Sequence, residues 1–325
     1  MSSPILGIDI GKETYAAALV VEQRVSKREF PNTPRGFGQL STWLTRRGVQ
    51  QVHACLEATG RYGDALAEYL YQAGHTVSVV NPARIKAYMK SQLARNKTDP
   101  LDAALIADFC RTQNPPAWTP PAPEIRELQE LLHQYQALQD ARQQEANRLQ
   151  AGLKAHSVQA LIQAHLDFLD QQITEIKQLI QNHLDRHPHL KAQRDLLTSI
   201  PGIGDLTAAH LIVVELPRFA DARAVTAFGG LNPMLRTSGK SVWGNPRLSK
   251  IGHRSLRKAL YFPALTAKRY NPIVKALCER LAERGLCPMA IIGAAMRKLL
   301  CLAYGVLKSG RPFDLNYAAK RDFAA

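Results

Sequence analysis

Short apolar runs alternate with amphipathic stretches in the first third of the chain. The apolar runs at residues 4–10 and 14–21 are separated by a Gly-Lys turn, which predicts a hairpin of two strands. The pattern that follows predicts strands at 51–57 and 75–80 and helices at 34–47, 61–73, 83–93 and 99–112. Because the strands come first and then alternate with helices, we expect an α/β domain with a mixed sheet over residues 1–120.

The middle of the chain, residues 121–188, has the pattern of two long helices with a bend near 152–157. Its second half spaces apolar residues four and three apart, the heptad pattern of a coiled coil, at Ile162, Leu166, Leu169, Ile173, Ile176 and Ile180. This seam packs either within one chain, as a helical hairpin, or between two copies. Because the seam carries few charges, burial against a partner is favoured, and we predict an assembly segment.

The last part, residues 189–325, is helical in pattern except at 229–246, where Gly, Ser and Pro predict a flexible loop. The segment SIPGIGDLTAAHLI at 199–212 has the turn of a helix-hairpin-helix motif, in which Gly202 and Gly204 let backbone N–H groups approach a phosphate. The alternative is a tight turn between helices that needs glycine at positive φ. We therefore expect a mainly α domain with a helix-hairpin-helix-like turn.

Charge makes this last part the predicted nucleic-acid surface. The chain has 42 Lys and Arg against 27 Asp and Glu, a net charge of +15. Between Asp221 and Glu279 it has eleven basic residues and no carboxylate, an imbalance that a phosphate backbone would neutralise. A membrane surface is excluded because the most apolar run, 289–307, contains Arg297 and Lys298. The predicted contacts are Arg236, Lys240, Arg254, Arg257 and Lys258.

Other classes of site are not indicated. The five cysteines are scattered without a C-x-x-C pair, and the N-terminus has no secretory signal, so we expect reduced thiols in a cytoplasmic protein. The ten histidines form no metal-binding set. The chain has neither a Walker loop nor G-x-G-x-x-G, which argues against nucleotide cofactors and an ATPase.

Four carboxylates form the candidate catalytic set. Asp9 lies inside an apolar strand, where an isolated carboxylate would be costly, and Glu57 ends another strand. Asp99 and Asp102 are three residues apart at a helix start, so they face the same way. Alone, Asp99 would be read as a helix N-cap and Glu57 as a surface strand end. Together, the four residues can bind divalent cations for phosphoryl transfer.

These residues carry a resemblance to a known family. ILGIDIGKE with Asp9, CLEATG with Glu57, and RNKTDPLDA with Asp99 and Asp102 resemble the DEDD transposases, RuvC-like recombinases of bacterial insertion sequences that use a bridge RNA. The resemblance extends to about residue 312. It implies an RNase H-like (RuvC-like) domain at 1–120, an assembly segment at 121–188 and a transposase domain at 189–325. It also implies Mg²⁺ as cofactor and makes Arg95 and Lys97 nucleic-acid contacts.

The resemblance further implies a serine nucleophile. Composition alone does not choose among Ser238, Ser241 and Ser249, whereas the family pattern places the serine ahead of a glycine, at Ser238. The neighbours Thr237 and Lys240 depart from that pattern, which leaves Ser241 as the second candidate.

The implied partners are donor and target DNA, a bridge-type RNA, and further copies in a dimer or tetramer, near the nucleoid during activity. A RuvC-like nuclease that uses water as nucleophile is the alternative.

Overall fold

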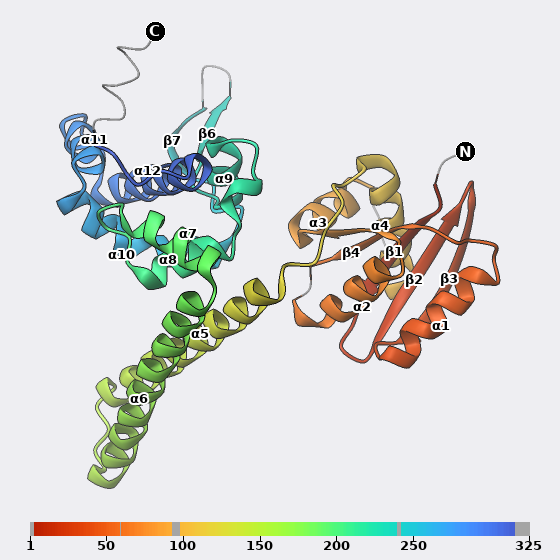
Figure 1. Cartoon of the computed structure of the whole chain (residues 1–325), viewed down its shortest axis with the longest axis horizontal. Coiled ribbons are helices and arrows are strands. Elements are labelled where there is room, and N and C mark those ends of the chain that lie inside the picture. The colour runs from red at the N-terminus through yellow and green to blue at the C-terminus, as the bar shows by residue number, and fades with distance from the viewer. Residues whose placement is uncertain (1–2, 59, 93–97, 239–241, 316–325) are drawn as a thin grey trace. The chain divides into compact units, whose positions relative to one another are not determined.

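The structure, a computed structural model, describes residues 3–58, 60–92, 98–238 and 242–315. Its contacts divide the chain into two compact units, Met1–Pro121 and Ala122–Ala325. Figure 1 shows both units and the labels used below.

The first unit is built on a five-stranded mixed sheet in the order β3-β2-β1-β4-β5. β1 pairs antiparallel with β2 and parallel with β4, and β4 pairs parallel with β5. The strands are β1 Ile5–Ile10, β2 Thr14–Val21, β3 Arg24–Pro31, β4 His53–Glu57 and β5 Thr76–Val80. The predicted α/β domain with a mixed sheet is confirmed, and this arrangement fits an RNase H-like fold.

Helices cover both faces of this sheet (Figure 1). Alternate strand residues point to opposite faces, so each strand contributes to two cores. Leu6, Ile8 and Leu56 face α1 and α2, whereas Cys55 and Val80 face α3 and α4. The helices are α1 Pro34–Thr45, α2 Arg61–Gln72, α3 Pro82–Ser91 and α4 Asp99–Gln113.

The pattern did not predict β3, the edge strand. Its sequence RVSKREFP is polar, and Phe30 is the residue of this strand that is buried. An edge strand with one buried side chain gives too little apolar alternation to be recognised.

The second unit is mostly helical. The long helices α5 and α6 pack on each other and appear side by side in Figure 1. Shorter helices follow them, and α12 packs against several of these, including α10 and α11. The elements are α5 Pro123–Gln150, α6 His156–Arg186, α7 Pro188–Thr198, α8 Asp205–Ile212, a 3₁₀ turn Leu216–Arg218, α9 Ala222–Phe228, α10 Arg254–Tyr270, α11 Pro272–Glu283 and α12 Pro288–Ser309.

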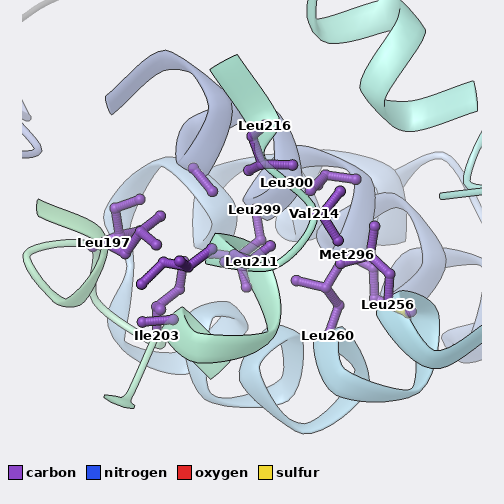
Figure 2. Packing of buried hydrophobic residues seen from close by; sticks show 14 of the residues in the cluster. Leu197, Ile203, Leu211, Val214, Leu216, Leu256, Leu260, Met296, Leu299 and Leu300 are labelled. Atoms are coloured by element: carbon purple, nitrogen blue, oxygen red, sulfur yellow. The ribbon is translucent and has the colours of Figure 1, made fainter. Parts of the chain in front are cut away.

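A single apolar core holds these shorter helices together. Figure 2 shows residues of α7, α8, α10 and α12 meeting in it, including Leu197, Leu211, Leu260 and Leu299. Among the described residues, α12 is the helix long and apolar enough to cross a membrane, with a mean hydropathy of 1.6. Leu299 and Leu300 of this helix are fully buried in the core, and half of the apolar window is buried.

The segment at 229–246 differs from the expectation of a flexible loop. It forms most of a two-stranded antiparallel hairpin, β6 Pro233–Ser238 and β7 Val242–Leu248, with an irregularity in register between Met234 and Arg236. Gly and Pro weaken the strand pattern here, but backbone pairing across the hairpin does not depend on side-chain alternation. The hairpin is where the second unit carries its candidate serine.

Candidate active site

Asp9 and Glu57 lie on neighbouring parallel strands at the same edge of the sheet. The parallel pairing of β1 with β4 ends at Ile8 and Leu56, the residues that directly precede the two carboxylates. Neighbouring strands are about 4.8 Å apart, and residues at matched positions point to the same face. Because Ile8 and Leu56 face α1 and α2, Asp9 and Glu57 face the opposite side, which α4 covers.

A close contact fixes α4 on that face. A Cβ added to Gly7 would lie 2.1 Å from the Ala103 carbonyl oxygen and 2.3 Å from the Ala107 nitrogen. Ala103 also packs with Ala16, the residue that pairs with Asp9. The amino-terminal end of α4 is therefore at the end of β1 that carries Asp9.

The first turn of α4 contains the other two predicted carboxylates. Asp102 is 9% exposed and its backbone N–H donates to Thr98 O at 2.9 Å, whereas Asp99 is exposed. Acidic residues in a first helical turn are stabilised by the helix dipole. The structure thus brings Asp9, Glu57 and Asp102 to one edge of the sheet, with Asp99 on the same turn as Asp102.

The donor set suits a hard divalent cation, because carboxylate oxygens are the ligands that Mg²⁺ prefers. In the described residues, no three His, Cys, Asp or Glu side chains are grouped so that they would hold a metal ion. Asp9, Glu57 and Asp102 each take part in other interactions.

The serine of the hairpin belongs to the second unit. The backbone places Ser238 at the last position of β6, paired with Val242 of β7. Arg236 pairs with Gly244 in the same ladder. Lys240 and the alternative Ser241 lie outside the described residues, as do Arg95 and Lys97 of the first unit.

The turn between α7 and α8 has two different glycines. Gly202 has φ +108° and lies against α10, because a Cβ there would be 2.7 Å from the Ala267 Cβ. Close packing alone therefore accounts for glycine at 202. Gly204 is the N-cap of α8, and a Cβ there would meet no atom within 4 Å. The next residue, Asp205, already places a carboxylate in the first turn of α8.

The three basic residues predicted on α10 have different surroundings. Arg254 is exposed in the first turn. Lys258 Nζ lies 2.8 Å from Asp140 Oδ1 of α5, in an exposed ion pair. The guanidinium of Arg257 donates to Gly229 O at 3.0 Å, which gives it a partner inside the domain.

Sequence reasoning missed a polar cluster at the opposite edge of the sheet. His53 Nε2 lies 2.8 Å from Ser78 Oγ, and a hydrogen bond joins Cys55 to Cys110. That bond, together with His53, lowers the pKa of the Cys110 thiol, although burial acts in the other direction. A cavity of about 490 Å³ opens beside His53 and Cys110. Two widely separated cysteines in apolar sequence gave no signal for this cluster.

Comparison with known proteins identifies the class. Residues 6–158 match a family model described as a transposase, and residues 194–279 match a model described as the IS116/IS110/IS902 transposase family. The first match covers the elements that carry the four carboxylates, and the second covers the hairpin. The protein is a transposase, an enzyme that acts on DNA.

The relatives give the family. The chain is 33% identical to the pilin gene-inverting protein of Moraxella lacunata, over 97% of this chain and 98% of that protein. It is 27% identical to the transposase for insertion sequence element IS1328 of Yersinia enterocolitica, over 67% of this chain and 71% of that one. The chain belongs to the IS116/IS110/IS902 transposase family.

A solved structure, T. thermophilus RuvC in complex with a Holliday junction substrate, is also similar. The TM-score is 0.28 and the sequence identity 15%, and the match covers 36% of this chain and 100% of the RuvC chain.

Proposed function

We propose that this transposase is an RNA-guided DNA recombinase that cuts and rejoins strands through a phosphoserine intermediate. The observation that carries the proposal is the placement of Asp9, Glu57 and Asp102 at one edge of an RNase H-like sheet, in a chain whose relatives are transposases. A relative bears the name pilin gene-inverting protein, and inversion of a gene requires strands to be rejoined to new partners as well as cut.

The carboxylates have the role of metal ligands in this proposal. Asp9, Glu57, Asp99 and Asp102 would hold Mg²⁺, one or two ions per site. When bound, the ion neutralises charge on the scissile phosphate. Asp102, in the first turn of α4, is 9% exposed, so this candidate ligand lies against the domain and not on its open surface.

Ser238 has the role of nucleophile. Its hydroxyl oxygen attacks phosphorus and loses its proton, the bond from phosphorus to the 3′ oxygen breaks, and a 3′-hydroxyl leaves. The phosphoserine that forms retains the energy of the phosphodiester for attack by a second 3′-hydroxyl. The position of Ser238 at the end of β6 supports this role, because the end of a β-hairpin can enter a DNA groove. Arg236 and Lys240, close to Ser238 in sequence, would bind the phosphate.

The nucleic acids would be donor DNA, target DNA and a guide RNA of the bridge type. The support is the run of eleven basic residues without a carboxylate between Asp221 and Glu279. Exposed Arg254 suits phosphate contact, whereas at Gly204, the N-cap of α8, a phosphate would compete with the Asp205 carboxylate in the first turn. Arg95, Lys97 and Lys258 complete the proposed contacts, and we expect the protein to act in the cytoplasm, at the nucleoid.

Assembly would use α6, but a different face from the one the heptad pattern suggested. The heptad residues are buried within this chain, 2–7% exposed. A second apolar set remains exposed on α6: Leu161 at 72%, Phe168 at 56% and Leu179 at 52%. Their spacings of seven and eleven residues put them on one face of the helix. We infer that this face joins copies of the chain in a dimer or tetramer.

Cleavage of a nicked or supercoiled DNA substrate by two variants tests the proposal. Asp9→Asn removes a ligand without removing a basic contact, so cleavage should be lost while DNA binding remains. Glu13→Gln, at an exposed turn between β1 and β2, is the matched control and should cleave as wild type does. Cleavage by Asp9→Asn at the wild-type rate, or cleavage in EDTA, would contradict the carboxylate assignment. Cleavage by Ser238→Ala would select the nuclease that uses water.

A further inference from the structure

The β6–β7 hairpin is joined to the helical core at a short base. Backbone hydrogen bonds of 2.7 to 3.2 Å connect the segment before β6 to the segment after β7: Ser249 N to Asn232 O, Lys250 N to Gly230 O, and His253 N to Phe228 O. The direction in which the hairpin leaves the core is therefore set by residues 228–232 and 249–253. The residues that fix this direction lie at the start of β6, whereas Ser238 lies at its other end.

Arg257 of α10 contacts the backbone at this base. Its Nη1 donates to Gly229 O at 3.0 Å, and a Cβ added to Gly230 would lie only 2.6 Å from the same nitrogen. Burial, together with the neighbouring charge of Arg254, lowers the pKa of Arg257, although an arginine remains protonated at physiological pH. The guanidinium is thus packed under the backbone turn that leads into β6.

Two glycines at this turn lie so close to neighbouring atoms that a larger side chain would not fit. Gly230 has φ +64° and Gly252 has φ +145°, and a Cβ on Gly252 would lie 2.3 Å from Phe228 O. Thr226, which is fully buried, donates its hydroxyl to Asn232 Oδ1 at 2.9 Å. Close backbone contacts and a buried side-chain bond define a single geometry for the base, in which Arg257 supplies the charged hydrogen bond.

The second strand of the hairpin is fixed to a different helix. A Cβ added to Gly293 of α12 would lie 2.9 Å from Leu248 Cδ1, so the last residue of β7 packs directly on that helix. Arg257 of α10 therefore contacts the turn before β6, and Gly293 of α12 contacts the end of β7, so the two ends of the hairpin are held by different helices.

We propose that Arg257 is a positioning residue for the hairpin that ends in Ser238, and that it is not a phosphate contact. The inference rests on the proposed function in so far as Ser238 is the nucleophile. The hydrogen bond to Gly229 O and the packing against Gly230 occupy the guanidinium inside the domain. An arginine held in this way orients the backbone leading to the nucleophile, without touching substrate.

Hydrogen exchange of the full chain, without DNA, is the first test. Arg257→Gln should raise the amide exchange of residues 229–253 by about tenfold or more, because a hydrogen bond to a charged donor is lost. Arg254→Gln, one turn earlier on α10 and equal in charge change, should leave that exchange as in wild type. Arg257→Lys keeps the charge and one donor and should restore part of the protection. Equal exchange in Arg257→Gln and wild type would overturn the inference.

DNA binding and covalent-adduct assays separate positioning from phosphate contact. Arg257→Gln should keep the wild-type dependence of affinity on salt, while the rate of adduct formation at saturating DNA falls about 10- to 100-fold from a displaced nucleophile. Arg254→Gln should lower the salt slope by about one unit. The same reduced slope in Arg257→Gln, with the adduct formed at the wild-type rate, would overturn the inference. Absence of any adduct in wild type would instead refute the phosphoserine, and the exchange result would still decide the role of Arg257.

Discussion

Gly7 of β1 and Ala103 of α4 are in such close contact that a Cβ on Gly7 would lie 2.1 Å from the Ala103 carbonyl oxygen. This contact brings the first turn of α4, with Asp102, to the end of β1 that carries Asp9. Gly7 in the strand ILGIDI, a residue with no side-chain chemistry, therefore sets how closely the Asp102 turn of α4 approaches the Asp9 end of β1.

Substitution at this contact should lower the stability of the first unit. Gly7→Ala would push α4 from the sheet, and overpacking of this kind costs about 1–3 kcal/mol of unfolding free energy. Gly38→Ala is the matched control, because Gly38 is in helix α1 and a Cβ there meets no atom within 4 Å. It should stabilise the chain by about 0.5–1 kcal/mol. Urea unfolding measures the change in free energy for each variant. Equal unfolding midpoints for Gly7→Ala and wild type would show that α4 is not held at Gly7.

The two apolar faces of α6 should respond differently to charge. Leu161→Glu with Phe168→Glu should lower the oligomer mass while leaving the melting temperature near that of wild type, because these side chains are exposed in the single chain. Leu169→Glu with Ile173→Glu should instead destabilise the α5–α6 hairpin by several kcal/mol, because it buries charges. Light scattering and thermal melting give the two readouts. An unchanged mass in the first double variant, or a monomeric wild type, would refute assembly through this face.

Acidification should destabilise the second unit through His210. Burial, with His253 and His133 nearby, lowers the pKa of His210 from its ordinary value to about 4. Between about pH 6.5 and pH 4 the unfolded chain binds more protons than the folded one, so the unfolding free energy falls as the pH falls through this window. His210→Gln should flatten that dependence, and His156→Gln, at the exposed start of α6, should not. The pH dependence of the unfolding free energy is measured by urea titrations at several pH values, with hydrogen exchange of the α8 amides as the signal. The same slope in wild type and His210→Gln would exclude His210 as the cause.

Much of the first unit could be predicted from sequence because its strands bury one or both faces. The short apolar runs ILGIDI and TYAAALVV, joined by a Gly-Lys turn, predicted the β1–β2 hairpin. Asp9 was then recognised as a carboxylate inside an apolar strand, and Glu57 as the end of another. The parallel pairing that makes these two carboxylates neighbours is a long-range contact, which local periodicity does not determine. The closeness of Gly7 to Ala103 is of the same kind.

The second unit shows where local patterns are insufficient. The heptad residues from Ile162 to Ile180 predicted a helix with an apolar face correctly, but spacing does not tell a partner in the same chain from one in another copy. Leu161 and Phe168 directly precede the heptad residues Ile162 and Leu169. In the sequence, this second apolar face could therefore not be told apart from the heptad seam. At 229–246 the glycines suggested a loop, whereas Gly230 and Gly252 permit the close contacts that anchor a hairpin.

Covalent capture of DNA tests the central claim most directly. Wild-type protein on a nicked suicide substrate, from which the released strand diffuses away, should carry DNA through denaturation, and digestion with mass spectrometry should locate a phosphoserine at residue 238. The adduct should be lost in Ser238→Ala and retained in Ser249→Ala, the serine that follows β7. Persistence of the adduct in Ser238→Ala would contradict the assignment and make Ser241 the next candidate, and cleavage without any adduct in wild type would show that water is the nucleophile.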